Sequence, residues 1–238
     1  MSAGARKRIV AVVPALDEEA CVGDVVRGIA PYVDHVVIVD NGSRDRTASV
    51  AREAGADVVA EPIRGYGRAC LAGLERARSL KADVVLFLDA DGSDAPADAP
   101  LLIDPVVRGE ADLALGRRRR GLVEPGAMTS VQRFGNWFGP ALMRIGLGAP
   151  YHDMPPFKVC SLAAVDRLAL SDTGHGFTIE LLIKAHRAGL RVVEIDVRCR
   201  ARRGGVSKVS GTVLGASRAA VKIVSTIARH TVAARREG

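Results

Sequence analysis

Residues 84–91 read Val-Val-Leu-Phe-Leu-Asp-Ala-Asp. Five apolar residues run without interruption into two aspartates, Asp89 and Asp91, which lie two positions apart. A continuous apolar run of this length is typical of a strand that is buried on both faces of a parallel sheet. Two carboxylates at the end of such a strand are costly if they stay dry and unpaired. Because hard oxygen ligands at this spacing suit Mg²⁺ or Mn²⁺, the stretch predicts a buried strand that ends in a metal site or, alternatively, in a polar turn.

The first half of the chain alternates strands with helices. Alternation of this kind predicts an α/β fold with a Rossmann-like, mostly parallel central sheet and helices on both faces. Ligands of such sheets bind beyond the carboxyl ends of the strands, and acidic or amide groups follow three of the expected strands, at 14–18, 40–43 and 89–91. We therefore expect these groups to meet on one rim of the sheet. The expected strands are 9–14, 35–40, 57–60, 83–88 and 112–116, and the expected helices are 17–30, 45–54, 66–80 and 96–109.

The second half is less regular, but it shows no internal repeat and no low-complexity linker. The whole chain, 1–238, is therefore expected to form a single domain. Its last expected helix, 212–230, is amphipathic and could cover the core, contact a second copy in a homodimer, or lie on a membrane surface. The other expected elements are strands at 157–161 and 191–197 and helices at 129–145, 163–170 and 177–188.

Composition narrows the classes of function. The net charge is +7 and aromatic residues make up 4% of the chain, so an aromatic platform for single-stranded nucleic acid is not expected. The four cysteines are far apart and form no Cys-x-x-Cys pair, so we expect neither zinc nor disulfides and a reducing, cytoplasmic compartment. No run of about 18 apolar residues is present, so no transmembrane helix is expected.

Four motifs occur in order along the chain. They are Pro-Ala-Leu-Asp-Glu at 14–18, Val-Asp-Asn-Gly-Ser-Arg-Asp-Arg-Thr at 39–47, Asp-Ala-Asp at 89–91, and Arg-Gly-Gly-Val-Ser-Lys at 203–208. Together they resemble the family-2 glycosyltransferases of the GT-A fold, nearest the dolichyl- and polyprenyl-phosphate sugar synthases. The chain departs from the family's usual pattern at Leu16, Asp17 and Asn41, which touch the presumed base pocket.

The resemblance implies a nucleotide-diphosphate sugar, linked to UDP or GDP, as donor. About residues 8–116 would form the donor-binding half, with Asp91 as the direct ligand of Mg²⁺ or Mn²⁺ and Asp89 as a supporting ligand or ribose contact. The basic segment 203–208 would clamp the phosphates. The donor-binding residues that the resemblance implies are Pro14, Leu16, Glu18, Asp40, Gly65, Gly67, Asp89, Ala90, Arg203, Ser207 and Lys208.

The acceptor side, about residues 117–211, would bind a polyprenyl phosphate or a small molecule. Arg117 and Arg133 are the candidates for contacts to the acceptor. A hydroxyl acceptor needs a catalytic base, whereas a phosphate acceptor is already an anion and needs none. The candidates for a base are Glu180 and Asp153. The resemblance implies an enzyme of the inverting, metal-dependent type. The basic loop and the amphipathic last helix favour an acceptor at a membrane surface, which would place the enzyme at the inner face of the membrane.

Two other readings compete with this one. A sugar-1-phosphate nucleotidyltransferase would need a glycine-rich, arginine-bearing loop after the first strand, but residues 15–19 read Ala-Leu-Asp-Glu-Glu. A non-enzymatic nucleic-acid-binding protein is suggested by the charge alone. The acidic strand ends and the low aromatic content argue against nucleic acid as a partner.

Overall fold

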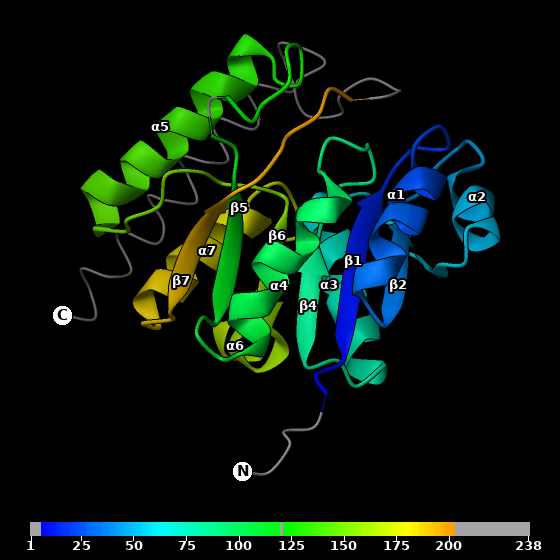
Figure 1. The fold of residues 1–238 in the computed structure, drawn as a ribbon, viewed down its shortest axis with the longest axis horizontal. Helices are drawn as coiled ribbons and strands as arrows, with labels where there is room; N and C mark the ends of the chain where they lie inside the picture. Colours follow the sequence, from blue (N-terminus) through cyan, green and yellow to red (C-terminus); the bar gives the residue numbers. More distant parts are fainter. Residues whose placement is uncertain (1–5, 120, 203–238) are drawn as a thin grey trace.

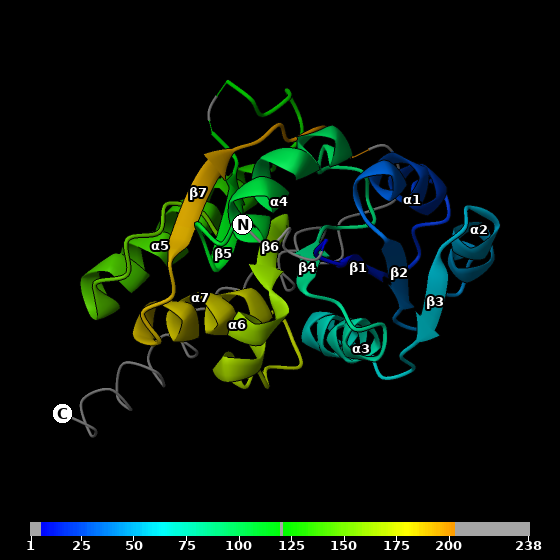
Figure 2. The same ribbon diagram turned by 60° about the horizontal axis from the view of Figure 1, so that its bottom comes forward.

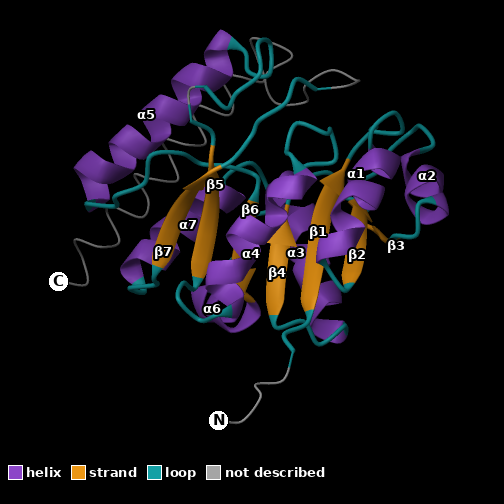
Figure 3. Cartoon of the chain, viewed as in Figure 1, coloured by secondary structure: helices purple, strands orange, loops and turns teal. Residues whose placement is uncertain are grey.

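A computed structural model describes residues 6–119 and 121–202 of the chain. Its centre is a seven-stranded sheet in the order β3-β2-β1-β4-β6-β5-β7 (Figures 1 and 3). The strands are β1 (Ile9–Ala15), β2 (His35–Asp40), β3 (Asp57–Ala60), β4 (Val84–Phe87), β5 (Leu113–Arg117), β6 (Lys158–Ser161) and β7 (Val192–Asp196). The helices are α1 (Val22–Ile29), α2 (Thr47–Glu53), α3 (Tyr66–Ser79), α4 (Ala99–Val107), α5 (Ser130–Leu147), α6 (Leu162–Leu168) and α7 (Phe177–Arg187), with 3-10 turns η1 (Ala30–Tyr32) and η2 (Pro96–Asp98).

The expected parallel sheet is confirmed, with one exception in its middle. Strands β3, β2, β1 and β4 pair in parallel, and so do β5 and β7. Among the described strands, β6 alone runs against its neighbours, because it pairs antiparallel with both β4 and β5. The carboxyl ends of β1, β2, β4, β5 and β7 therefore face the same rim, as the fold class predicts.

Helices cover both faces of the sheet, so the core has two layers (Figure 2). Alternate residues of β1 point to opposite faces: Val10 and Val12 pack with α3, α6 and α7, whereas Ala11 and Val13 pack with α1 and α4. The central residues of β1, β2 and β4, such as Val12, Val37 and Leu86, are fully buried, which explains the unbroken apolar runs in the sequence. The four cysteines Cys21, Cys70, Cys160 and Cys199 are also buried, as free thiols.

Two expected helices begin later than the sequence predicts. The segment expected to open a helix at 17 is a loop, and α1 starts at Val22. The loop forms because its backbone bonds elsewhere: the N–H of Asp17 donates to Ser43 Oγ and the N–H of Glu18 donates to Thr47 Oγ1. The segment expected as one helix at 96–109 divides into η2 and α4, each with a proline in its first turn.

The remaining element boundaries agree with the expected ones to within about two residues. The amphipathic helix expected at 212–230 lies outside the described residues. Within the part of the chain that the structure describes, no helix combines the length and the apolar character that crossing a membrane requires.

Candidate active site

Acidic side chains gather at the carboxyl ends of β1 and β4, where the sheet predicts a ligand site. We call Glu18, Asp89, Asp91 and Asp94 the acidic cluster. Asp91 Oδ1 accepts a hydrogen bond from the N–H of Ser93 at 2.9 Å, and Asp94 Oδ2 accepts one from the N–H of Asp89 at 3.0 Å. These two bonds fold the Asp-Ala-Asp segment back on itself. The strand therefore ends in the polar turn that the sequence offered as one alternative. The other alternative, a metal site at these carboxylates, stays a prediction.

Arg202 joins the acidic cluster from the far end of the described chain. Its Nη2 lies 2.8 Å from Asp91 Oδ2, and its Nη1 lies 3.1 Å from Glu18 Oε1. Sequence reasoning missed this residue, although it immediately precedes the basic 203–208 motif. The predicted donor-binding residues Arg203, Ser207 and Lys208 lie outside the described residues.

Burial and the repulsion between neighbouring carboxylates disfavour the charged forms of Asp89 and Asp94. Burial, followed by the charges of Asp91 and Asp94, raises the pKa of Asp89. Burial also raises the pKa of Asp94, although the hydrogen bond from the N–H of Asp89 opposes this shift. Carboxylates in this state are stabilised by a cation in contact with them. Arg202 shows that Asp91 and Glu18 can hold one.

The donor set therefore fits a divalent cation, but only with help from a ligand. Among the described residues, no group of three or more His, Cys, Asp and Glu side chains is arranged to hold a metal. Mg²⁺ typically binds through one or two carboxylates together with substrate phosphates. Asp91 and Asp89, the predicted metal ligands, match this type of site rather than a complete protein cage.

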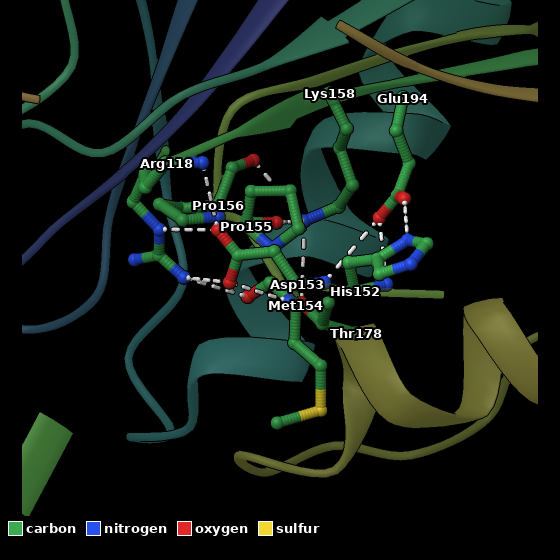
Figure 4. Close-up of polar contacts among 9 residues, drawn as sticks. All are labelled: Arg118, His152, Asp153, Met154, Pro155, Pro156, Lys158, Thr178 and Glu194. Carbon is green, nitrogen blue, oxygen red and sulfur yellow. Dashed lines mark hydrogen bonds and ion pairs between the residues drawn. The ribbon is translucent and has the colours of Figure 1, made fainter. Parts of the chain in front are cut away.

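A buried lysine lies next to the cluster. Lys158 is 0% exposed, and its Nζ donates to the carbonyl oxygens of Pro155 and Pro156 and to Thr178 Oγ1 at 3.1–3.2 Å (Figure 4). Burial lowers the pKa of Lys158, and nearby groups that include Asp89 oppose this shift. The lysine ties the loop before β6 to the start of α7. It also places a positive charge beside the acidic cluster.

The predicted donor residues lie along adjacent strand ends. Pro14 and Leu16 are half-buried at the end of β1, and Asp40 ends β2 beside Ala15. Ala90 is buried within the acidic turn. The structure thus brings the predicted donor residues of the first three motifs to one rim. Their contacts to a nucleotide stay a prediction.

Asn41 gives a physical reason for one departure from the family pattern. Its Nδ2 donates to the carbonyl oxygens of Glu61 and Ile63, at 3.0 and 2.8 Å, and its Oδ1 accepts from the N–H of Gly65 at 2.7 Å. An aspartate has no N–H to donate. The amide therefore fixes the 61–65 loop that leads into α3.

Gly65 and Gly67 are needed for a close contact that the sequence did not reveal. A Cβ on Gly67 would lie 2.0 Å from the carbonyl oxygen of Asp172, and one on Gly65 would lie 2.3 Å from that of Thr173. The N–H of Gly67 also donates to the carbonyl oxygen of Gly174. Both glycines admit protein backbone, and their predicted role toward the nucleotide is untested.

A hollow is lined by residues from the end of β5, from the loop that follows it and from the start of α5. Figure 1 shows α5 beside β5 and β7. We call this hollow the basic cleft, a cavity of about 710 Å³. It contains both predicted acceptor-side residues, Arg117 and Arg133, together with the apolar side chains of Met128 and Trp137. Its lining residues are Arg117, Arg118, Arg119, Gly121, Val123, Glu124, Pro125, Gly126, Met128, Arg133, Asn136, Trp137, His152 and Asp153.

The acidic cluster and the basic cleft share one wall. Cys199 forms β-bridges with Asp94 on one side and with Val123 of the cleft on the other. The N–H of Arg200 donates to the carbonyl oxygen of Ser93, and Arg202 reaches the acidic cluster from the same segment. A ligand in the cleft would therefore be separated from the acidic cluster by a single extended segment.

The two candidate bases are both engaged in structural contacts. Asp153 Oδ2 accepts from the Nε and the backbone N–H of Arg118, both at 2.9 Å, and Oδ1 accepts from Nη2 at 2.7 Å (Figure 4). Burial alone would lower the pKa of Arg118, but the charge and hydrogen bonds of Asp153 outweigh it and raise that pKa. Glu180 accepts from the backbone N–H groups of Ser171 and Asp172 and pairs with Lys184. A catalytic role for Glu180 or Asp153 is untested, and these contacts give each a positioning role.

Solved structures identify the class of protein that this architecture defines. Glucosyl-3-phosphoglycerate synthase from Mycobacterium tuberculosis, in complex with Mn²⁺, UDP-glucose and phosphoglyceric acid, superimposes with a TM-score of 0.74 at 26% identity. The match covers 93% of this chain and 80% of that one. The fold is therefore that of a GT-A glycosyltransferase.

Sequence comparison then gives the family. The model of glycosyl transferase family 2 matches residues 10–172. An uncharacterized glycosyltransferase of Mycobacterium tuberculosis is 40% identical over 209 residues, which is 87% of this chain and 92% of the relative. The undecaprenyl-phosphate mannosyltransferase of Micrococcus luteus is 30% identical over 226 residues, 90% of this chain and 88% of the relative. The chain belongs to glycosyl transferase family 2, and it is a glycosyltransferase rather than a nucleotidyltransferase or a nucleic-acid-binding protein.

Proposed function

We propose that this enzyme transfers a sugar, with inversion, from a UDP- or GDP-linked donor to a phosphate-bearing acceptor, with Mg²⁺ or Mn²⁺ as cofactor. The observation that carries the proposal is the shared wall between the acidic cluster and the basic cleft. One side suits a metal-bound diphosphate and the other an anionic acceptor. The donor and the acceptor would then bind next to each other, on either side of the 197–202 segment.

The donor would lie at the carboxyl ends of β1, β2 and β4. Asp91 would hold the cation, with Asp89 in support, and Pro14, Leu16 and Asp40 would surround the base and ribose. When bound, the cation would offset the negative charge that grows on the leaving nucleoside diphosphate. Arg202 already contacts Asp91 and Glu18, so it lies where a diphosphate would bring further negative charge. We propose that it contributes a hydrogen bond to that leaving group.

The acceptor would lie in the basic cleft. Arg117 and Arg133 suit a phosphate, since guanidinium groups bind phosphate oxygens with two parallel hydrogen bonds. Met128 and Trp137 offer apolar surface next to them. This combination favours a polyprenyl phosphate, the acceptor named for the Micrococcus luteus relative, over a small phosphorylated molecule. Such an acceptor implies work at a membrane surface.

Thermal shift measurements test the donor half of the proposal. UDP or GDP should raise the melting temperature only with Mn²⁺ or Mg²⁺ present, and Asp91→Ala should abolish that shift. A panel of nucleotide sugars, assayed for donor hydrolysis, would then identify the sugar. Normal turnover by Asp91→Ala would show that the metal site is assigned to the wrong residue.

Transfer assays test the acceptor half. Two acceptors should be assayed with the donor that the panel selects: undecaprenyl phosphate in detergent micelles and 3-phosphoglycerate. Glycosylation of the lipid alone supports the favoured acceptor, and glycosylation of 3-phosphoglycerate alone refutes it. Arg133→Ala should raise the KM of the true acceptor and leave donor hydrolysis unchanged.

A further inference from the structure

Two arginine–aspartate ion pairs close the two ends of the β5–β7 pairing. At one end, Arg191 Nη2 lies 2.9 Å from Asp112 Oδ1. At the other end, Arg117 and Asp196 are register partners, and Arg117 Nε lies 2.6 Å from Asp196 Oδ1. The two aspartate side chains are almost equally exposed, at 25% for Asp112 and 24% for Asp196. In both pairs the hydrogen bond from the arginine lowers the pKa of the aspartate.

The two ends differ in what lies beside them. Asp112 and Arg191 are not part of the basic cleft, whereas Arg117 lines it. Asp196 also lies 3.3 Å from Nη1 of Arg119, a second arginine of the cleft. One pair therefore closes the strand ladder only. The other closes it and also holds cleft arginines.

Glu194 does the same for a histidine of the cleft. It lies two residues before Asp196 on β7, so both side chains leave the same face of this edge strand. Glu194 Oε2 lies 2.6 Å from Nδ1 of His152, and Oε1 accepts from the backbone N–H groups of His152 and Asp153 (Figure 4). The carboxylate is thus fixed by the backbone and in turn fixes the imidazole. His152 lines the cleft beside Arg117.

We infer that Glu194 and Asp196 are positioning residues that hold His152 and Arg117 for the phosphate of the acceptor. The inference rests on the proposed function of the cleft. A free arginine or histidine side chain loses rotamer freedom when it binds a ligand, and a side chain that is already held loses less. Within the described residues, Arg117 makes its ion pair through Nε, which leaves its terminal nitrogens for phosphate oxygens.

Matched variants at the two ladder ends test the inference. Asp196→Ala and Asp112→Ala each remove an arginine–aspartate ion pair at one end of the ladder. Asp112→Ala also removes the hydrogen bond from the N–H of Arg191, so it should lower the stability of the fold at least as much as Asp196→Ala does. Only Asp196→Ala should weaken binding of farnesyl phosphate, by about tenfold, the effect of one charge-assisted hydrogen bond. Glu194→Gln should weaken it as well. Asp196→Glu should restore part of the loss, and UDP with Mn²⁺ should bind all variants as it binds the wild type.

Two probes separate the sources of the phosphate. If the acceptor is a lipid, the tenfold effect appears with farnesyl phosphate and not with 3-phosphoglycerate; for a soluble acceptor the reverse holds. Either result supports the positioning role. Asp196→Asn, which keeps the side-chain volume, replaces Asp196→Ala if that variant does not fold.

The failures of the two proposals are distinguishable. If Arg117→Ala loses phosphate binding but Asp196→Ala binds as well as the wild type or more tightly, the positioning inference is wrong and the proposed function stands. Equal losses in Asp196→Ala and Asp112→Ala would also overturn it, since the effect would then be a general one on the fold. If Arg117→Ala binds both probes normally and UDP with Mn²⁺ gives no thermal shift, the proposed function itself fails.

Discussion

Asp153→Ala should destabilise the fold around Arg118, whether or not Asp153 takes part in proton transfer. The side chains of Asp153 and Arg118 are only 7% and 14% exposed, and three hydrogen bonds join the two residues. Asp153→Ala leaves the guanidinium buried without its counter-charge. Breaking a buried ion pair in this way costs about 3–5 kcal/mol.

A second substitution separates this structural cost from catalysis. Arg118→Met removes the stranded charge, so the double variant should recover much of the lost stability, since apolar replacements of buried pairs are often neutral. If Asp153 acts as a base, the double variant should be stable but inactive. If it acts only by stabilising the segment around it, activity should return together with stability.

Urea unfolding followed by circular dichroism measures the energies, and a thermal scan gives the corresponding change in melting temperature. For a chain of this length, about 4 kcal/mol corresponds to a fall of roughly 10 °C. A loss below about 1 kcal/mol for Asp153→Ala would refute the reasoning, because that is the size of an exposed ion pair. So would a double variant that is no more stable than Asp153→Ala.

Three further predictions concern Glu180, the helical glycines Gly67 and Gly135, and Asn41. Burial alone would raise the pKa of Glu180, but hydrogen bonds from Lys184 and from the backbone of Asp172 and Ser171 outweigh burial and lower it. The stabilising contribution of Glu180 is therefore complete above its ordinary pKa of 4.5 and is lost as the pH falls. Glu180→Gln should therefore cost about 2 kcal/mol at neutral pH and progressively less on acidification, as measured by urea unfolding across a pH series. Gly67→Ala should lower the stability of the fold by more than about 2 kcal/mol, although Gly67 lies in a helix. Gly135→Ala, whose Cβ would meet nothing within 4 Å, should raise the stability by about 1 kcal/mol. Equal melting temperatures of the two variants would contradict this prediction. Asn41→Asp should cost about 2 kcal/mol because two backbone carbonyls lose their donor, and an unchanged urea midpoint would show that the 61–65 loop is held otherwise.

The sequence predicted the fold well where one local signal was sufficient. The apolar runs at 35–40 and 84–88 fixed both the strands and their burial, and the alternation of strands with helices implied the rim where Asp40 and Asp91 lie. The direction of β6 could not be predicted, because a four-residue strand carries the same pattern whether it pairs parallel or antiparallel. The late start of α1 was hidden for a similar reason: acidic residues at 17–19 suit a helix start, and the loop depends on contacts to residues near 45.

The site was predictable by residue type and not by partner. Arg117 and Arg133 line one cleft, and their predicted role toward the acceptor stays a prediction. The carboxylates that contact the cleft residues, such as Asp196, have no distinguishing pattern in the sequence. Gly67 was predicted as a donor-binding residue, yet the loop that packs against it, at Asp172, is more than 100 residues away in the sequence. Arg202 bonds to residues 111 and 184 positions distant. Pairings at such separations leave no periodic trace.

The labelling rates of the buried cysteines can measure how often different parts of the structure open. Thiol reagents attack the thiolate, and burial raises the pKa to about 12 for Cys70 and Cys160 and to about 11 for Cys199. Each cysteine should therefore react only as fast as the surrounding structure opens. The labelling rates of Cys70 and Cys160, which lie in the core, should report the opening of the whole sheet. The labelling rate of Cys199, which lies in the wall that carries Arg202, should report how often that wall separates from Asp94 and Val123.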